Sequence, residues 1–283
     1  MGPVKIAVGQ MTAKNDLLTN YSTCERLCQQ AAEAGCKLLC LPECFSFLGS
    51  SDQESLSIAE PLDGPLMEKY KQLAQTQQMW LSLGGFQEKG PDPEHRYNSH
   101  VLVSASGEIV STYRKIHLFD IDIPGAPVLK ESRGTAPGSD VVVADTPFGR
   151  VALTVCYDLR FPELFQELRF SKSADILLIP AAFTVPTGEA HWEVLLRARA
   201  IETQCYVIAA AQAGQHNEKR ASYGHSIVID PWGKVIGKCE DPLATDICVA
   251  EIDLDTVSSI RTRMPIATHR RYDLYDSRRS DGE

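Results

Sequence analysis

Three residues of the types used in acyl-transfer chemistry each follow a predicted strand. Cys156 comes after the apolar run 151–155 and before Pro162, which suits the first turn of a helix. A thiol at such a junction projects from the edge of a sheet, and a nearby helix N-terminus would favour its thiolate form. Cys156 is therefore a candidate nucleophile. An inert buried thiol is the alternative that the strand alone supports.

Glu43 and Lys115 supply the other groups that this chemistry needs. Glu43 follows the strand-like run 39–41 and Pro42, at the end of a sheet where α/β proteins place their ligands. Burial there is expected to raise the pKa of Glu43 toward neutrality, as a general base requires. Lys115 ends a third strand and, with the backbone N–H of Tyr157, is a candidate oxyanion donor. A solvated glutamate and a surface lysine are the alternatives.

The elements that must position these residues alternate between strand-like and helix-like patterns. Strands are predicted at 5–11, 37–41, 80–85, 97–103, 108–113, 140–145, 150–155, 175–180 and 204–211, with more within 224–253. Helices are predicted at 15–34, 65–78, 188–203 and 255–263, and another one opens near Pro162. Gly84 and Gly85 are expected to end their strand. Hairpins among β-α units predict an α/β fold with mixed sheets.

The composition limits the classes of protein to which the chain can belong. The chain has 283 residues, of which 43% are hydrophobic, and this is enough for one domain over 1–275 with a polar tail at 276–283. No apolar run approaches the roughly 20 residues that span a bilayer. A net charge of −9 argues against nucleic acid and anionic membranes as partners. A small molecule is the expected partner.

Nine cysteines and the absence of a secretory leader predict a reducing compartment. Five of them cluster without a C-x-x-C pair, which favours small buried apolar residues over a metal site: Cys24, Cys28, Cys36, Cys40 and Cys44. Nucleotide-binding glycine motifs and H-E-x-x-H do not occur in suitable context, so we expect no metal and no cofactor. We expect a cytoplasmic protein, with a mitochondrial form if a targeting segment lies upstream.

The motifs Leu-Pro-Glu43, Tyr-Arg-Lys115 and Val-Cys156-Tyr-Asp-Leu-Arg-Phe-Pro-Glu resemble the Glu, Lys and Cys motifs of the nitrilase superfamily, in the same order. The resemblance covers essentially the whole chain. It implies a four-layer α-β-β-α sandwich that forms a homodimer or a higher homo-oligomer by packing sandwiches together.

The resemblance also implies a second glutamate in a loop after the lysine. Glu131, in Val-Leu-Lys-Glu131-Ser-Arg, is our candidate for this residue, which orients the lysine or the substrate. Asp120 and Asp122 are rivals, and a free surface carboxylate is an equal alternative for Glu131.

Three further stretches, 190–206, 219–226 and 230–233, resemble the small-amidase branch of that superfamily. This implies hydrolysis of deaminated glutathione to 2-oxoglutarate and cysteinylglycine through a thioester on Cys156. The first alternative is omega-amidase chemistry on 2-oxoglutaramate or 2-oxosuccinamate. An N-carbamoyl hydrolase and a non-catalytic binding protein are further alternatives.

Residues near the nucleophile in sequence are candidates for binding the substrate. Arg160 suits a bidentate contact with a carboxylate, although an ion pair with Asp158 or Glu163 is an equal alternative. Phe183 and Thr184 follow the strand that ends at Pro180, and we expect them to line the pocket.

Two other groups of residues are tempting but weaker candidates. Lys219 and Arg220 either reach a glycine carboxylate of the substrate or lie in a solvated loop. We assign no chemistry to His191, Trp192 and His225, because Glu43 already provides the base.

Overall fold

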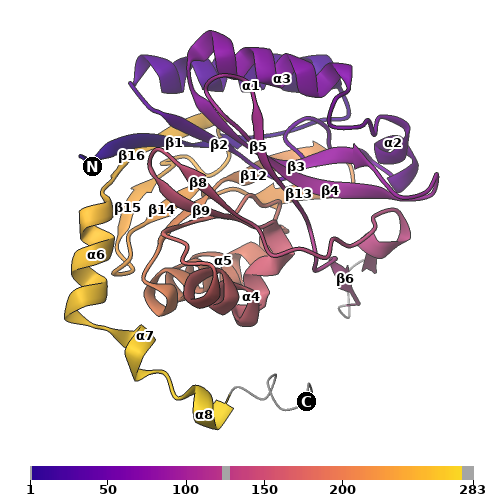
Figure 1. Ribbon diagram of the computed structural model, residues 1–283. Helices are drawn as coiled ribbons and strands as arrows, with labels where there is room; N and C mark the ends of the chain where they lie inside the picture. The colour runs from indigo at the N-terminus through magenta and orange to yellow at the C-terminus, as the bar shows by residue number, and fades with distance from the viewer. Residues whose placement is uncertain (1, 123–127, 276–283) are drawn as a thin grey trace.

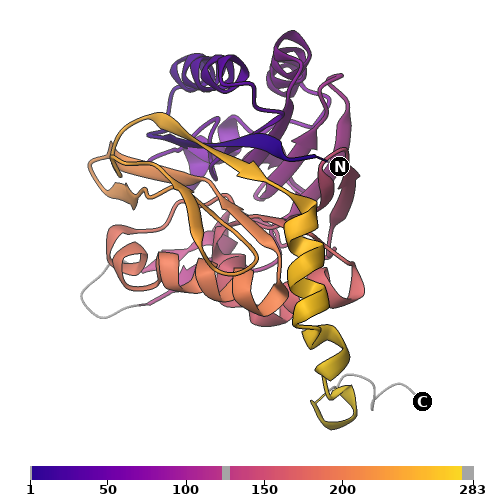
Figure 2. The ribbon, with the colours of Figure 1, turned by 90° about the vertical axis from the view of Figure 1, so that its left-hand side faces the viewer.

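Two β-sheets lie face to face between two layers of helices, as Figures 1 and 2 show. The computed structural model describes residues 2–122 and 128–275. Helices α1 (Leu17–Glu33) and α3 (Pro65–Gln77) cover one sheet, and α4 (Pro162–Gln166) and α5 (Val185–Thr203) cover the other. The predicted four-layer α-β-β-α sandwich is confirmed.

The first sheet carries the strands that precede Glu43 and Lys115. Its order is β13-β12-β1-β2-β3-β4-β5, and β16 also pairs with β1. Its strands are β1 (Val4–Met11), β2 (Leu38–Leu41), β3 (Trp80–Lys89), β4 (Arg96–Val103), β5 (Ile109–Arg114), β12 (Ala211–Asn217), β13 (Arg220–Tyr223) and β16 (Asp246–Ile252). β2 runs parallel to β3, and β4 is antiparallel to both β3 and β5. The carboxyl ends of β2 and β5 therefore lie at the same edge.

The second sheet carries the strand that precedes Cys156. Its order is β15-β14-β11-β10-β9-β8. Its strands are β8 (Val143–Thr146), β9 (Gly149–Leu153), β10 (Ile176–Leu178), β11 (Tyr206–Ala209), β14 (Ile227–Ile229) and β15 (Val235–Lys238). β9, β10 and β11 are parallel. A separate two-stranded ribbon, β6 (Asp120–Ile121) with β7 (Leu129–Lys130), precedes Glu131.

The core consists of two apolar clusters. One lies between the first sheet and its helices, and the other extends from the opposite face of the first sheet through the second sheet to α5. Ile6 and Val8 of β1 point into the cluster between the sheets, whereas Ala7 points into the cluster under α1 and α3. This alternation follows from the period of two along a strand. In α1, Leu27 and Cys28 form part of the buried stripe.

The prediction that Gly84 and Gly85 end a strand is wrong. β3 continues to Lys89, and its register with β4 shifts between Leu83 and Phe86. Gly85 has a φ of +70°, and a Cβ at Gly84 would lie 2.1 Å from the Cβ of Pro180. The two glycines therefore form a bulge where the second sheet approaches closely.

The predicted single strand over 204–211 is two strands. β11 ends at Ala209 in the second sheet, and β12 begins at Ala211 in the first. The sequence reasoning also missed the short helix α2 (Asp52–Ser57) and the hairpin of β12 with β13.

The chain closes with three helices. They are α6 (Leu254–Arg263), α7 (Ile266–His269) and α8 (Tyr272–Tyr275), and the predicted tail 276–283 lies outside the described residues. Within 2–122 and 128–275, no helix has the length and apolar character to cross a membrane. Over the same ranges, no cluster of three or more His, Cys, Asp or Glu could hold a metal ion.

Candidate active site

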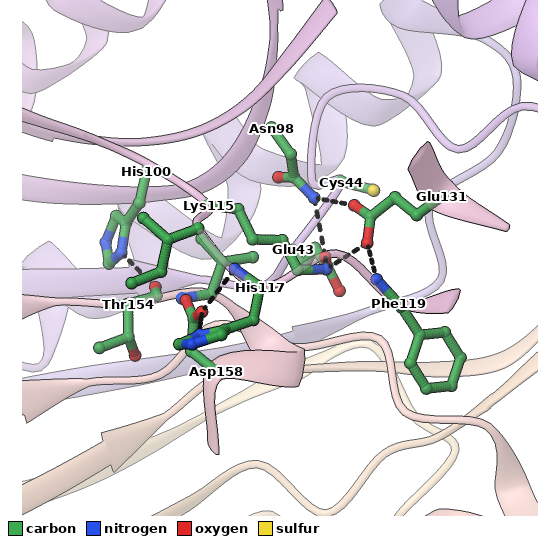
Figure 3. Close-up of polar contacts among 12 residues, drawn as sticks. Glu43, Cys44, Asn98, His100, Lys115, His117, Phe119, Glu131, Thr154 and Asp158 are labelled. Carbon is green, nitrogen blue, oxygen red and sulfur yellow. Dashed lines mark hydrogen bonds and ion pairs between the residues drawn. The ribbon is translucent and has the colours of Figure 1, made fainter. Parts of the chain in front are cut away.

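The structure brings Glu43, Lys115 and Cys156 together in the interior. Each follows the carboxyl end of a strand, β2, β5 and β9 respectively. Their relative exposures are 4%, 2% and 8%. The Nζ of Lys115 lies 3.1 Å from the Oε1 of Glu43. Figure 3 shows these two side chains next to each other. Cys156 lies close enough to both residues that their charges alter its pKa.

Cys156 opens a tight turn rather than a long helix. It has a φ of +48° and begins the 3₁₀ turn Cys156–Arg160, which leads into α4. Its backbone N–H donates to the carbonyl of Pro180 at 2.8 Å. A residue with a side chain in this left-handed conformation costs roughly 1–2 kcal/mol, so the surrounding contacts must hold the turn.

Lys115 joins two carboxylates. Its Nζ donates to Glu43 and, at 2.8 Å, to the Oε2 of Glu131. The same Oε2 accepts the backbone N–H of Phe119 at 2.8 Å. The predicted Glu131 therefore contacts the lysine. Its rival Asp120 instead accepts hydrogen bonds from Ser132.

The sequence reasoning missed Asn98, which holds both glutamates. Its Nδ2 donates to the Oε1 of Glu43 at 2.9 Å and to the Oε1 of Glu131 at 3.1 Å. A signal existed in the sequence, because Asn98, Ser99 and His100 are three consecutive polar residues inside a strand of the core. Burying such groups is costly unless they are hydrogen-bonded, so a polar run in a core strand indicates a network.

Glu43 is ionised despite its burial. Burial raises its pKa, but Lys115, Cys156, Arg220 and Asn98 together lower the pKa below its ordinary value of 4.5. The expectation that burial raises the pKa of Glu43 toward neutrality is therefore wrong. The ammonium group of Lys115 is the largest of the opposing influences.

The thiol of Cys156 is protonated in the resting site. Burial, and then the charge of Glu43, raise the pKa of Cys156 well above its ordinary value, against the opposing effects of Lys115 and the backbone N–H of Ala182. The expectation that a helix N-terminus favours the thiolate is not met, because α4 begins only after the 3₁₀ turn.

Lys115 keeps its positive charge. Burial lowers the pKa of Lys115, but Glu131 and Glu43 raise it well above its ordinary value. The resting site is therefore a neutral thiol beside a carboxylate and an ammonium group.

Arg160 and Phe183 lie together beside the turn that begins at Cys156. The Arg160 guanidinium lies 5.3 Å from the centre of the Phe183 ring and 5.9 Å from that of Tyr157. Its Nη1 is 3.2 Å from the Nδ1 of His191. Thr184 is the residue before α5, and its hydroxyl contacts that of Thr187.

The alternative ion pairs of Arg160 do not form. Among residues 2–122 and 128–275, Arg160 has no ion pair with Asp158 or Glu163. The carboxylate of Asp158 is bound by Tyr113 and His117 instead.

Comparison with known proteins defines the class. The carbon-nitrogen hydrolase family model matches residues 5–262. The chain belongs to this family, so it is a hydrolase of carbon-nitrogen bonds, and the resemblance to the nitrilase superfamily is confirmed.

Individual relatives are similar over most of their length. The human protein named deaminated glutathione amidase is 50% identical over 274 residues, which cover 95% of this chain and 83% of the human one. The crystal structure of the Caenorhabditis elegans NitFhit protein matches with a TM-score of 0.91 at 47% identity, over 97% of this chain and 66% of that chain. Saccharomyces cerevisiae Nit3, a member of branch 10 of the nitrilase superfamily, matches with a TM-score of 0.82 at 29% identity, over 98% of this chain and 97% of that chain.

Proposed function

We propose that this enzyme is an amidase that hydrolyses deaminated glutathione to 2-oxoglutarate and cysteinylglycine. The observation that carries the proposal is the ion cluster of buried Glu43 and Lys115 with the partly buried Glu131, beside the thiol of Cys156. This cluster contains a base, a fixed cation and a nucleophile, which are the groups that amide hydrolysis requires. The naming of relatives that are 50% and 49% identical as deaminated glutathione amidase supports the choice of substrate.

The charges of Glu43 and Cys156 before the substrate binds determine how acylation begins. Because Glu43 is ionised and the thiol is neutral, Glu43 accepts the thiol proton as the sulfur attacks the amide carbonyl. Lys115 and the backbone N–H of Tyr157 donate to the oxygen that becomes negative. The first N–H groups of a helical turn have no partner within that turn, so the N–H of Tyr157 is suited to this role.

Glu43 then returns the proton to the leaving amine, and the acyl group remains on Cys156 as a thioester. A water molecule attacks the thioester and gives a proton to Glu43. The intermediate then breaks down to the free acid, and Glu43 returns the proton to the sulfur of Cys156. Glu131 orients Lys115 through their 2.8 Å contact. Acid-quenched enzyme is expected to carry a 2-oxoglutaryl group on Cys156.

Arg160, Phe183 and Thr184 are the proposed contacts for the substrate. The guanidinium of Arg160 has no carboxylate partner within the described ranges, and it lies beside Tyr157, next to the nucleophile. Arg160→Lys keeps the charge but loses bidentate geometry, so KM is expected to rise by about tenfold. The matched control is Arg150→Lys, in a surface pair with Asp145. An unchanged KM in Arg160→Lys would remove the binding role.

Arg220 is a candidate for the carboxylate of the dipeptide leaving group. It is exposed at the start of β13, and its charge is close enough to lower the pKa of Glu43. Arg220→Gln is therefore expected to raise KM for deaminated glutathione and to leave KM for 2-oxoglutaramate unchanged. Equal effects on both substrates would argue against this contact.

The test of the proposed function is a parallel assay of the two amides. We expect kcat/KM for deaminated glutathione to exceed that for 2-oxoglutaramate or 2-oxosuccinamate. The reverse order would assign omega-amidase activity instead. Carbon dioxide release from carbamoylated amines would indicate an N-carbamoyl hydrolase. If none of these is hydrolysed and acid-quenched enzyme carries no acyl group on Cys156, the chain is a non-catalytic binding protein.

We also propose that the enzyme is a homodimer of the cytoplasm. Four exposed apolar side chains lie on α5, on the turn between β14 and β15 and directly after α6: Val194, Ile201, Trp232 and Met264, with exposures of 71%, 50%, 63% and 39%. Ile201, Trp232 and Met264 line one apolar hollow. A contiguous apolar patch supports association. Nine free cysteines suit a reducing compartment, and a mitochondrial form would require a targeting segment.

A further inference from the structure

Asp158 is a buried carboxylate that the proposed reaction does not use. Its relative exposure is 0%. Within the described ranges, no lysine or arginine pairs with it. A buried carboxylate is costly unless hydrogen bonds compensate for its lost hydration. Hydrogen bonds to its carboxylate must therefore stabilise its burial, and the donors of these bonds come from two separate segments of the chain.

The first segment is the end of β5, on both sides of Lys115. The hydroxyl of Tyr113, two residues before the lysine, donates to the Oδ2 of Asp158 at 2.7 Å. His117, two residues after it, approaches Oδ1 with its backbone N at 3.3 Å and its Nδ1 at 2.8 Å. Figure 3 shows Asp158 and His117 beside Lys115. The His117 ring also stacks on Phe161, with 3.7 Å between the ring centres.

The second segment is the turn that carries Cys156. The backbone N–H of Val155 donates to the Oδ2 of Asp158 at 2.8 Å, and the N–H of Asp158 donates to the carbonyl of Val155 at 3.1 Å. These two bonds close the backbone around Cys156, whose φ of +48° needs such support.

We propose that Asp158 is a positioning residue that fixes the turn of Cys156 against the strand end that carries Lys115. The lysine follows a strand of the first sheet and the cysteine follows a strand of the second, so their separation depends on contacts between the sheets. Asp158 provides such a contact directly. A misplacement of about 1 Å can slow an enzyme about 100-fold. This inference rests on the proposed roles of Cys156 and Lys115.

Two buried tyrosines offer a matched test. The Tyr113 hydroxyl donates to Asp158 and accepts the N–H of Ile116. The Tyr206 hydroxyl likewise donates to the carbonyl of Asp253 and accepts the N–H of Asp253, but it lies at the start of β11. Tyr113→Phe and Tyr206→Phe each remove one hydroxyl with two hydrogen bonds. Only Tyr113→Phe removes a hydrogen bond to Asp158.

The expected result is a similar loss of melting temperature in both variants and a difference in catalysis. Tyr113→Phe should lower kcat by about tenfold with KM within about twofold, whereas Tyr206→Phe should leave both near wild type. Alkylation of Cys156 by iodoacetamide should need a higher pH in Tyr113→Phe, because a displaced Lys115 favours the thiolate less. Asp158→Asn should have the same effects in larger measure, since its amide group faces hydrogen-bond donors.

Equal kcat values and equal alkylation profiles in Tyr113→Phe and Tyr206→Phe would overturn the positioning role. If Asp158→Asn does not fold, the tyrosine pair still decides the question. The Cys156→Ala variant distinguishes a failure of the proposed function from a failure of the positioning role of Asp158. If it keeps turnover, the proposed function fails. If it abolishes turnover while Tyr113→Phe behaves like Tyr206→Phe, only the role of Asp158 fails.

Discussion

Glu43 keeps its negative charge in a place where burial alone would remove it. Lys115 accounts for this, since its ammonium group lies 3.1 Å from the carboxylate and lowers the pKa of Glu43. The same carboxylate raises the pKa of Cys156. In the proposed reaction, proton transfer from the thiol to Glu43 is therefore unfavourable in free energy until the carbonyl oxygen of the substrate begins to take up negative charge.

The opposing effects of Glu43 and Lys115 on the thiol predict opposite shifts in two variants. Glu43→Gln removes a charge that raises the pKa of Cys156, so alkylation of Cys156 should begin at a lower pH than in wild type. Lys115→Met removes a charge that lowers this pKa, so alkylation should begin at a higher pH. Both variants should lose turnover, by about 100-fold or more.

The measurement is the pH dependence of iodoacetamide labelling at Cys156, followed by mass spectrometry of its peptide. Cys205 is a suitable internal reference, because it is buried just before β11 and the charges that act on its pKa are those of Arg261 and Arg169. Shifts of the same sign in both variants would contradict the charge arrangement described above.

The residue types and the strand-end positions of Glu43, Lys115 and Cys156 could be predicted from sequence, because a short apolar run followed by a polar residue marks the end of a buried strand. The directions in which the pKa values of Glu43 and Cys156 shift could not be predicted from sequence. They depend on neighbours that only the fold brings together, such as Asn98 and Arg220.

The bulge in β3 allows the two sheets to approach each other at the active site. A Cβ on Gly84 would lie 2.1 Å from the Cβ of Pro180 and 2.7 Å from the carbonyl oxygen of Leu41. Both neighbours matter to the site. Pro180 accepts the backbone N–H of Cys156, and Leu41 ends the strand that leads to Glu43.

Sequence reasoning recognised the two glycines but could not tell a bulge from a strand end, because both use glycine.

Gly84→Ala is expected to cost about 1–3 kcal/mol of stability, because the two sheets must separate to admit the methyl group. It should also lower kcat, since Pro180 and Cys156 move together. The measurements are urea unfolding and steady-state kinetics. Gly2→Ala, where a Cβ meets nothing within 4 Å, is the control. Wild-type stability and kcat in Gly84→Ala would show that the bulge has no such role.

The crossover from β11 to β12 could not be read from sequence for a related reason. Residues 205–211 are all apolar and all buried, although they belong in part to one sheet and in part to the other. Only residue 210 separates the last residue of β11 from the first of β12. Hydropathy reports burial, and it does not report which sheet buries a residue.

At the scale of the whole molecule, the outer surface of the α5 layer carries the proposed dimer interface. Trp232 and Ile201 border the hollow whose walls also include Ile260 and Met264. The opposite helical layer exposes Leu18 on α1, which lies on the far side of the sandwich in Figure 1. A dimer that packs α5 and α6 of two chains together would cover the first region and leave Leu18 exposed.

Ile201→Glu combined with Trp232→Glu is expected to shift the enzyme toward the monomer, because two buried charges oppose each other across a two-fold interface. Leu18→Glu, on the opposite layer, should leave association unchanged. Sedimentation velocity over a range of concentrations measures this. A double variant that stays dimeric would place the interface elsewhere.

We propose that Cys156 is the nucleophile of an amidase that acts on deaminated glutathione. The most direct measurement is the kcat of Cys156→Ala with that substrate, with circular dichroism to verify the fold. We predict that kcat falls by about 10⁴-fold or more, because no acyl-enzyme can form. A correctly folded Cys156→Ala enzyme with turnover close to wild type would contradict the claim.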